Sequence, residues 1–180
     1  MEFNTAGLLP ADDYHLTFGQ LRESILVKGK GDGSPWDESW RSLLVNNLEI
    51  MVNQLWEIGI TEIFIDGSFV EDKAHPNDID GYFVCDFNRY ITGELQNELN
   101  EKDRYKIWTW DSRSRREHKE HTKKQLPMWH AYRVELYPHF DKPYNTGIRD
   151  EFGNDQQFPA AFRKTRDTYL PKGIIKIINN

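Results

Sequence analysis

The sequence contains one cysteine, Cys85, and lacks any long run of apolar residues. A single cysteine excludes an intramolecular disulfide and a cysteine-rich zinc site, so we expect Cys85 to be a small core residue in a reducing cytoplasm. The chain also lacks a stretch of about 20 apolar residues and a basic N-terminal leader. The sequence therefore predicts a soluble, unprocessed, cytoplasmic protein with no membrane contact.

An excess of positive charge is also missing, because 29 acidic residues against 23 Lys and Arg give a net charge of −6. No overall field attracts nucleic acid, so any such contact must come from a local patch. Apolar residues, in contrast, are plentiful: 38% of the chain is hydrophobic and 13% is aromatic, which predicts an ordered globular protein. A length of 180 residues indicates a single domain, 1–180.

Local patterns divide this domain into a lead-in over residues 1–33, a core over about 36–137 and a tail over 141–180. In the lead-in, Thr17 and Gln20 have the spacing of a capping box before a short helical run. In the tail, the apolar run 174–178 predicts an edge strand.

The core begins with a predicted helix that Ser34 caps, that has Pro35 at its first position and that Gly59 ends. Its apolar stripe at helical spacing is Trp40, Leu44, Leu48, Met51, Leu55 and Ile58. Strands are expected at 60–65, 79–85, 106–111 and 132–137, with a helix over 90–99 and a polar insertion over 112–125. Strands that alternate with helices predict an α/β fold, with a mixed sheet of about four to five strands and flanking helices.

The most informative motif is Gly67-Ser68, which nine residues separate from Asp78-Ile79-Asp80. On an extended strand Asp78 and Asp80 project from the same face, with Cα atoms roughly 7 Å apart. Two carboxylates at about 4 Å repel by about 4 kcal/mol at an effective dielectric near 20, so a hard cation such as Mg²⁺ or Mn²⁺ is expected between them. Gly67 lets backbone approach a phosphate, and Ser68 can donate to its oxygens. The alternative is an ordinary turn and a cap.

The order of helix, buried strand, Gly-Ser turn and Asp-x-Asp strand resembles the polymerase-beta-like nucleotidyltransferase superfamily. The resemblance covers about residues 36–137 and is closest to small stand-alone members, some of them toxins of toxin–antitoxin pairs or antiviral effectors. It implies a nucleotidyltransferase-like fold in which Asp78 and Asp80 bind Mg²⁺ and a nucleoside triphosphate is the substrate. The implied reaction moves a nucleoside monophosphate to a hydroxyl on RNA, a protein or a small molecule.

This superfamily generally adds a third acid from a later strand, and Glu135 is the candidate for this catalytic and metal-binding position. A carboxylate in the middle of a sheet needs a partner or a metal to offset its desolvation. Arg133, on the same strand face, could neutralise Glu135 instead, and Asp111 is the reserve candidate. Asp66 faces either the same cleft or its own backbone.

Basic residues supply the remaining candidates. Lys73, in the connection between the two motifs, could bind a phosphate, although a solvated loop lysine is the alternative. The insertion carries a dense basic patch that could bind RNA, since basic side chains hold phosphates; its members are Arg113, Arg115, Arg116, Lys119, Lys123 and Lys124. The alternative is a solvated surface.

Two other functions stay open. The first is an inactive nucleotidyltransferase-fold module that regulates or binds a partner protein, for example a toxin. The second is a two-metal nuclease, which Tyr137 disfavours because restriction-type nucleases tend to carry a lysine two positions after the second acid.

Overall fold

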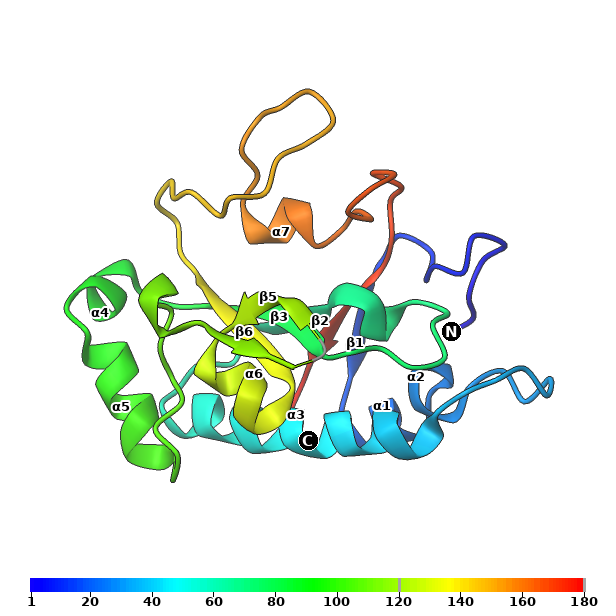
Figure 1. Ribbon diagram of the computed structural model, residues 1–180, viewed down its shortest axis with the longest axis horizontal. Coiled ribbons are helices and arrows are strands. Elements are labelled where there is room, and N and C mark those ends of the chain that lie inside the picture. Colours follow the sequence, from blue (N-terminus) through cyan, green and yellow to red (C-terminus); the bar gives the residue numbers. More distant parts are fainter. Residues whose placement is uncertain (120, 180) are drawn as a thin grey trace.

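The computed structural model describes residues 1–119 and 121–179. In this part of the chain the main sheet has five strands in the order β1-β7-β2-β3-β6 (Figure 1). The strands are β1 (Asp13–Leu16), β2 (Ile63–Asp66), β3 (Ile79–Val84), β6 (Val134–His139) and β7 (Ile174–Ile177). β1 pairs with β7 and β3 with β6 in parallel, whereas β2 is antiparallel to both β7 and β3. The predicted mixed α/β sheet is confirmed.

Helices and a hairpin complete the fold. The helices are α1 (Phe18–Glu23), α2 (Ile25–Lys28), α3 (Glu38–Glu57), α4 (Phe87–Ile91), α5 (Glu94–Lys102), α6 (Pro127–Tyr132) and α7 (Phe158–Ala161). Two 3₁₀ turns, η1 (Gly67–Val70) and η2 (Ser112–Ser114), precede strands. β4 (Arg116–His118) and β5 (His121–Gln125) form a separate two-stranded hairpin.

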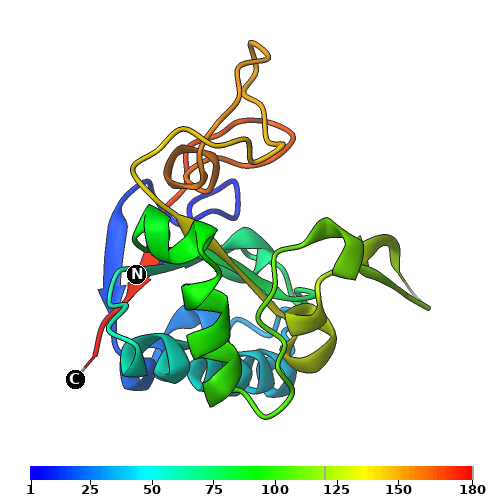
Figure 2. The same ribbon diagram turned by 90° about the vertical axis from the view of Figure 1, so that its left-hand side faces the viewer.

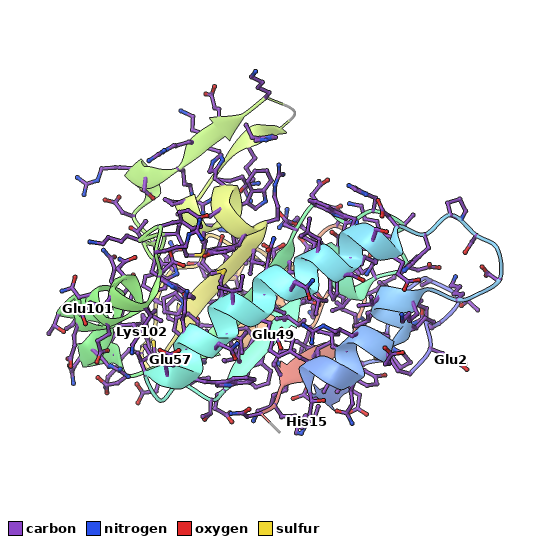
Figure 3. The ribbon with its side chains drawn as sticks, turned by 90° about the horizontal axis from the view of Figure 1, so that it is seen from below. Glu2, His15, Glu49, Glu57, Glu101 and Lys102 are labelled. Atoms are coloured by element: carbon purple, nitrogen blue, oxygen red, sulfur yellow. The ribbon has the colours of Figure 1, made fainter. Side chains whose placement is uncertain are left out.

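The two faces of the main sheet are covered differently. α3 runs along one face, where its apolar stripe packs on the odd-numbered residues of β2, such as Ile63 and Ile65 (Figures 1 and 3). The C-terminal segment with α7 crosses the other face, where Phe158 packs against Phe64 and Tyr82 (Figure 1). Because side chains alternate along a strand, even-numbered residues of β2 and β3 lie on the face beneath α7.

The long helix α3 forms as its stripe predicts, but it begins later than expected. Asp37 caps it, because the Asp37 carboxylate accepts a hydrogen bond of 2.9 Å from the Trp40 amide. Ser34 and Pro35 lie before the helix, so the predicted cap is wrong. Gly59 ends α3 with φ +82°, as expected for a residue just after a helix. The capping box of Thr17 and Gln20 at α1 is also confirmed.

The strand predicted at residues 106–111 is wrong. This segment pairs with no strand of the described chain, because the Asn100 side chain satisfies both backbone groups of Trp108, at 2.9 and 2.8 Å. The neighbouring Trp110 donates its indole N–H to the Leu136 carbonyl at 2.8 Å. The alternating tryptophans therefore reflect side-chain packing rather than a sheet register.

Other boundaries also differ from the predictions. β7 lies inside the sheet between β1 and β2 rather than at an edge, and β1 was not predicted. Gly93, with φ +80°, divides the helix predicted over 90–99 into α4 and α5. The insertion 112–125 forms the β4–β5 hairpin, which projects from the body of the molecule (Figure 2).

No helix in residues 1–119 and 121–179 combines the length and the apolar character that crossing a membrane requires.

Candidate metal and phosphate site

Asp66, Asp80 and Glu135 lie side by side on β2, β3 and β6 of the main sheet, and together with Asp78 we call them the acidic row. Asp80 on β3 lies directly opposite Asp66 on β2 and directly opposite Glu135 on β6. Residues opposite each other project from the same face, with Cβ atoms roughly 5 Å apart across an antiparallel pair. Asp78 precedes β3 by one residue and extends the row, so the sheet brings the three predicted acids Asp78, Asp80 and Glu135 together.

Asp80 occupies the centre of this acidic row. Burial, followed by the charges of Asp78 and Glu135, raises the pKa of Asp80 to about 8, while Lys123 and Arg166 oppose the shift. No hydrogen bond or ion pair reaches the Asp80 carboxylate from the rest of the described chain. This carboxylate therefore gains most from an added cation.

Glu135 is buried, with its side chain 3% exposed, and protein donors bind both of its oxygens. Oε1 accepts from the Leu126 amide at 2.9 Å and lies 3.4 Å from an Arg115 guanidinium nitrogen. Oε2 accepts from the Tyr137 hydroxyl. The prediction that Arg133 could neutralise Glu135 is wrong: Arg133 ends α6 with φ +55°, and its guanidinium lies 3.8 Å from the centre of a Trp129 ring.

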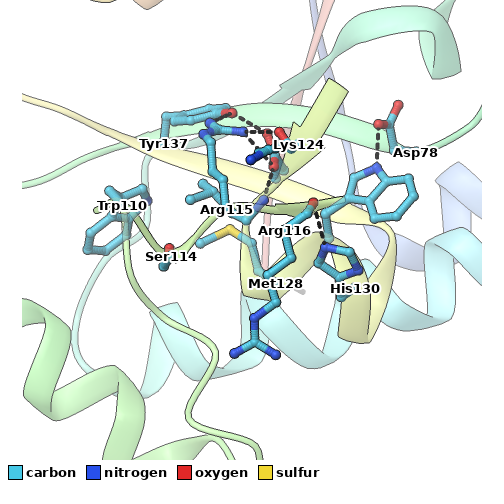
Figure 4. A network of polar contacts seen from close by, with 12 residues as sticks. Asp78, Trp110, Ser114, Arg115, Arg116, Lys124, Met128, His130 and Tyr137 are labelled. Carbon is cyan, nitrogen blue, oxygen red and sulfur yellow. Dashed lines mark hydrogen bonds and ion pairs between the residues drawn. The ribbon is translucent and has the colours of Figure 1, made fainter. Parts of the chain in front are cut away.

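Asp78 is oriented by α6. Its Oδ2 accepts a hydrogen bond of 2.7 Å from the Trp129 indole N–H (Figure 4). Burial raises the pKa of Asp78, the Trp129 hydrogen bond lowers it, and the charge of Glu135 raises it. Oδ1 accepts no hydrogen bond from the described chain, so it can bind a further ligand.

The Gly67-Ser68 turn lies against Asp80. Gly67 has φ +73°, and a Cβ at this position would lie 2.8 Å from Oδ2 of Asp80. Glycine is therefore required twice, for the backbone conformation and for the approach of the carboxylate. Ser68 follows in η1 and is partly exposed, so its hydroxyl can reach a ligand above the acidic row.

A buried arginine on α3 holds this turn from below. The Arg41 guanidinium donates to the carbonyls of Phe69, Glu71 and Lys73 at 2.7, 3.2 and 2.6 Å, and to that of Leu26 at 2.6 Å. Burial lowers the pKa of Arg41 to about 10, so the side chain is still a cation at neutral pH. The backbone of the turn is thereby fixed to the longest helix.

A buried lysine holds the turn from the C-terminal side. Nζ of Lys172 lies 3.2 Å from Oδ2 of Asp66, 2.6 Å from Oε1 of Glu71 and 3.4 Å from the Gly67 carbonyl oxygen. Burial raises the pKa of Asp66 to about 7, and the Lys172 charge limits the rise. Oδ1 of Asp66 is buried without a hydrogen-bond partner. Asp66 therefore lies beside the other acids of the row, but Lys172 balances its charge.

Two predicted candidates lie further out. Lys73 is exposed, although its charge lowers the pKa of Asp78. Asp111 caps η2 on the surface, and its carboxylate forms an ion pair of 2.7 Å with Arg113. Asp111 does not join the acidic row, so the structure gives its reserve role as third acid no support.

The basic residues of the insertion lie on or next to the β4–β5 hairpin. Arg115 reaches into the acidic row, whereas the others are exposed, namely Arg113, Arg116, Lys119, Lys123 and Lys124. Lys123 is close enough to lower the pKa of both Asp78 and Asp80. The hairpin therefore forms a positively charged wall beside the acids.

The sequence did not indicate the contacts that Tyr137, Lys172 and Arg166 make with the acids or the turn. The contact between Tyr137 and Glu135 could have been predicted, because residues two positions apart on a strand lie on the same face. The contact of Lys172 with the turn could not have been predicted from local sequence, because 105 residues separate Lys172 from Gly67.

The donor set suits Mg²⁺ when substrate phosphates complete it. Within residues 1–119 and 121–179 no three side chains of His, Cys, Asp or Glu are arranged to hold one metal ion. Mg²⁺, however, is usually bound through one or two carboxylates together with phosphate oxygens and water rather than by a protein cage. Asp78 and Asp80 supply two such carboxylates, so the residues present fit a metal that arrives with a polyphosphate.

A family model described as a family of unknown function, DUF6932, matches residues 1–178. The chain therefore belongs to this family. No curated protein and no solved structure matches the chain.

Proposed function

We propose that this member of DUF6932 is a metal-dependent nucleotidyltransferase that moves a nucleoside monophosphate from a nucleoside triphosphate to a hydroxyl group. One observation carries the proposal: the partly buried Asp80 carboxylate, which no donor of the described residues reaches, lies between Asp78 and Glu135 and against Gly67 of the Gly-Ser turn. A Mg²⁺–polyphosphate complex supplies the charge that this arrangement needs.

Each residue has a stated part in this reaction. Asp78 and Asp80 would hold Mg²⁺, which would neutralise charge on the phosphates when it is bound. Ser68 and the backbone beside Gly67 hold phosphate oxygens. The acceptor oxygen bonds to the α-phosphorus, the bond to pyrophosphate breaks, and Glu135 receives the hydroxyl proton. Oε2 of Glu135 can do so, because a carboxylate oxygen accepts two hydrogen bonds and the Tyr137 hydroxyl is its one donor among the described residues.

RNA is the proposed acceptor, because exposed basic side chains of the hairpin stand beside the acidic row. Basic residues that bind phosphates would guide an RNA end toward Asp80. A nuclease is disfavoured, because the position two residues after Glu135 is Tyr137, which donates a hydrogen bond to the acid instead of supplying a cation. An inactive module is disfavoured because the Gly-Ser turn and all three acids come together.

The test is transfer of label from each of four α-³²P nucleoside triphosphates to RNA or protein, in Mg²⁺, by wild-type protein and by Asp80→Asn. We expect the variant to lose at least about 100-fold in rate, because metal-assisted charge stabilisation is worth several kcal/mol. Asp111→Asn, on the surface outside the row, is the matched control and should keep wild-type activity.

Three outcomes would contradict the proposal. Near wild-type transfer by a folded Asp80→Asn protein would remove the role of Asp80. RNA cleavage without nucleotide would indicate the nuclease. Absence of calorimetric binding of all four triphosphates in Mg²⁺ would indicate an inactive module.

A further inference from the structure

Arg115 is the one cation of the hairpin region seen to enter the described acidic row. Its guanidinium lies 3.4 Å from Oε1 of Glu135, donates to the Tyr137 hydroxyl at 3.1 Å and donates to the Lys124 carbonyl at 3.2 Å (Figure 4). The side chain is 24% exposed, so it contacts both the buried acid and solvent. Burial lowers the pKa of Arg115, but the Tyr137 hydrogen bond and the charges of Glu135 and Asp80 outweigh it and raise the pKa.

The contact between Arg115 and Glu135 is weak in geometry. A charge-assisted hydrogen bond between a guanidinium and a carboxylate is usually about 2.7–2.9 Å long, and this one is 3.4 Å. Glu135 also has two other donors, the Leu126 amide and the Tyr137 hydroxyl. Glu135 therefore keeps two donors if Arg115 leaves. Arg115 would exchange this long contact, and its hydrogen bonds to the Tyr137 hydroxyl and the Lys124 carbonyl, for stronger charge-assisted bonds to phosphate.

The Arg115 guanidinium lies next to the candidate metal site and could bind phosphate instead of a carboxylate. Its planar set of donors matches phosphate as well as carboxylate. A polyphosphate bound to Asp78 and Asp80 through Mg²⁺ would place phosphate oxygens near Arg115, because Asp80 lies directly opposite Glu135. Lys123, whose charge also acts on Asp78 and Asp80, extends the positive wall on the same side.

We propose that Arg115 exchanges partners: it balances the charge of Glu135 in the free protein and binds the polyphosphate of the nucleotide when substrate arrives. This inference rests on the proposed function and adds to it the residue that recognises the polyphosphate. The exchange releases Oε1 of Glu135 from its cation at the moment when the acceptor hydroxyl needs that acid.

The proposal predicts effects of opposite sign for two ligands. Replacing Arg115 by an uncharged residue removes a cation from Glu135, so the acidic row attracts a lone divalent ion more strongly. The same replacement removes a phosphate donor, so the row binds a polyphosphate more weakly. A side chain that only supports the fold would change both affinities in the same direction.

The experiment measures calorimetric binding of Mn²⁺ alone and of inorganic tripolyphosphate in Mg²⁺ to the full chain. For Arg115→Met we expect tripolyphosphate affinity to fall at least about tenfold and Mn²⁺ affinity to rise about threefold or more. Arg104→Met, which replaces an exposed arginine outside the hairpin that lies over the Tyr105 ring, should change neither affinity. Arg115→Lys retains the charge, so its Mn²⁺ affinity should stay near that of wild type.

Distinct results overturn the two levels of the argument. If wild-type protein binds both ligands and Arg115→Met binds tripolyphosphate as wild type does, the role of Arg115 is wrong while the nucleotidyltransferase proposal stands. A fall in Mn²⁺ affinity in a folded Arg115→Met protein also overturns that role. If wild-type protein binds neither ligand, the proposed function fails and this inference fails with it.

Discussion

Two regions flank the acidic row, the turn 67–73 and the β4–β5 hairpin, and they are stabilised in different ways. The wall formed by the turn 67–73 is fixed by two buried cations, Arg41 on α3 and Lys172 before β7, which bind its carbonyls and carboxylates. The opposite wall, the β4–β5 hairpin, carries exposed cations and reaches the row through Arg115.

This difference separates two tasks that a phosphate site must perform. A turn that holds phosphate oxygens must be in place before the ligand arrives, because its backbone donors have to be pre-organised. The exposed cations of the hairpin would attract an RNA acceptor through their charge, and this attraction does not need side chains fixed in one position. The buried cations therefore stabilise geometry, and the exposed ones supply charge.

The largest effect should come from breaking the fixed wall at Lys172. Lys172→Met leaves Asp66 and Glu71 without their buried cation, so we expect the free energy of unfolding to fall by about 3 kcal/mol. Urea unfolding measures this loss. Lys176→Met, on the same side of the sheet and paired with Glu62, should cost less than about 1 kcal/mol because this pair is more exposed. Equal losses would show that burial of Lys172 has no special weight.

A smaller effect is expected at Gly67. Gly67→Ala combines a left-handed backbone with a Cβ 2.8 Å from Oδ2 of Asp80, and should cost about 2 kcal/mol of stability. Gly59→Ala has φ +82° but no neighbouring atom within 4 Å, and should cost about 1 kcal/mol. Mn²⁺ binding should weaken in the first variant alone. If both alanines weaken it alike, contact with Asp80 is not the reason for glycine at position 67.

The smallest effect on stability should come from the exposed wall. Arg116→Ala should change the free energy of unfolding by no more than about 0.5 kcal/mol, because the side chain is exposed on the hairpin. Its affinity for single-stranded RNA should nevertheless fall, and the salt dependence of binding should become shallower. Lys102→Ala on α5, an exposed lysine that pairs with Glu57 at 3.1 Å, is the control. RNA binding that both variants weaken alike would argue against a dedicated basic wall.

Part of the acidic row could be predicted from the sequence. Alternation along a strand put Asp78 and Asp80 on one face, and put Glu135 on the face opposite Val134 and Leu136. The choice of Glu135 as third acid came from the resemblance to the superfamily, and the register that brings it opposite Asp80 comes from the structure. Their metal and catalytic roles stay predictions, because geometry alone does not identify a ligand.

The partners of the row could not be found in this way. Arg133 was a reasonable partner for Glu135 on a continuous strand, but α6 extends to Tyr132 and leaves Arg133 in a left-handed cap. Arg115 replaces it from 20 residues away, and Lys172 reaches Gly67 across 105 residues. Contacts between segments distant in sequence depend on the tertiary fold, and the hydrophobic periodicity of each segment does not determine them.

The position of β7 bears on how this protein is made. β7 follows the other strands of the main sheet in sequence, yet it lies between β1 and β2 and joins them into one sheet. Until a ribosome has added β7, the open edge of β2 can pair with a neighbouring nascent chain, and β1 lacks the strand that it pairs with in the described sheet. Assembly of this sheet therefore waits for β7, and we expect the growing polypeptide to depend on chaperones until β7 emerges.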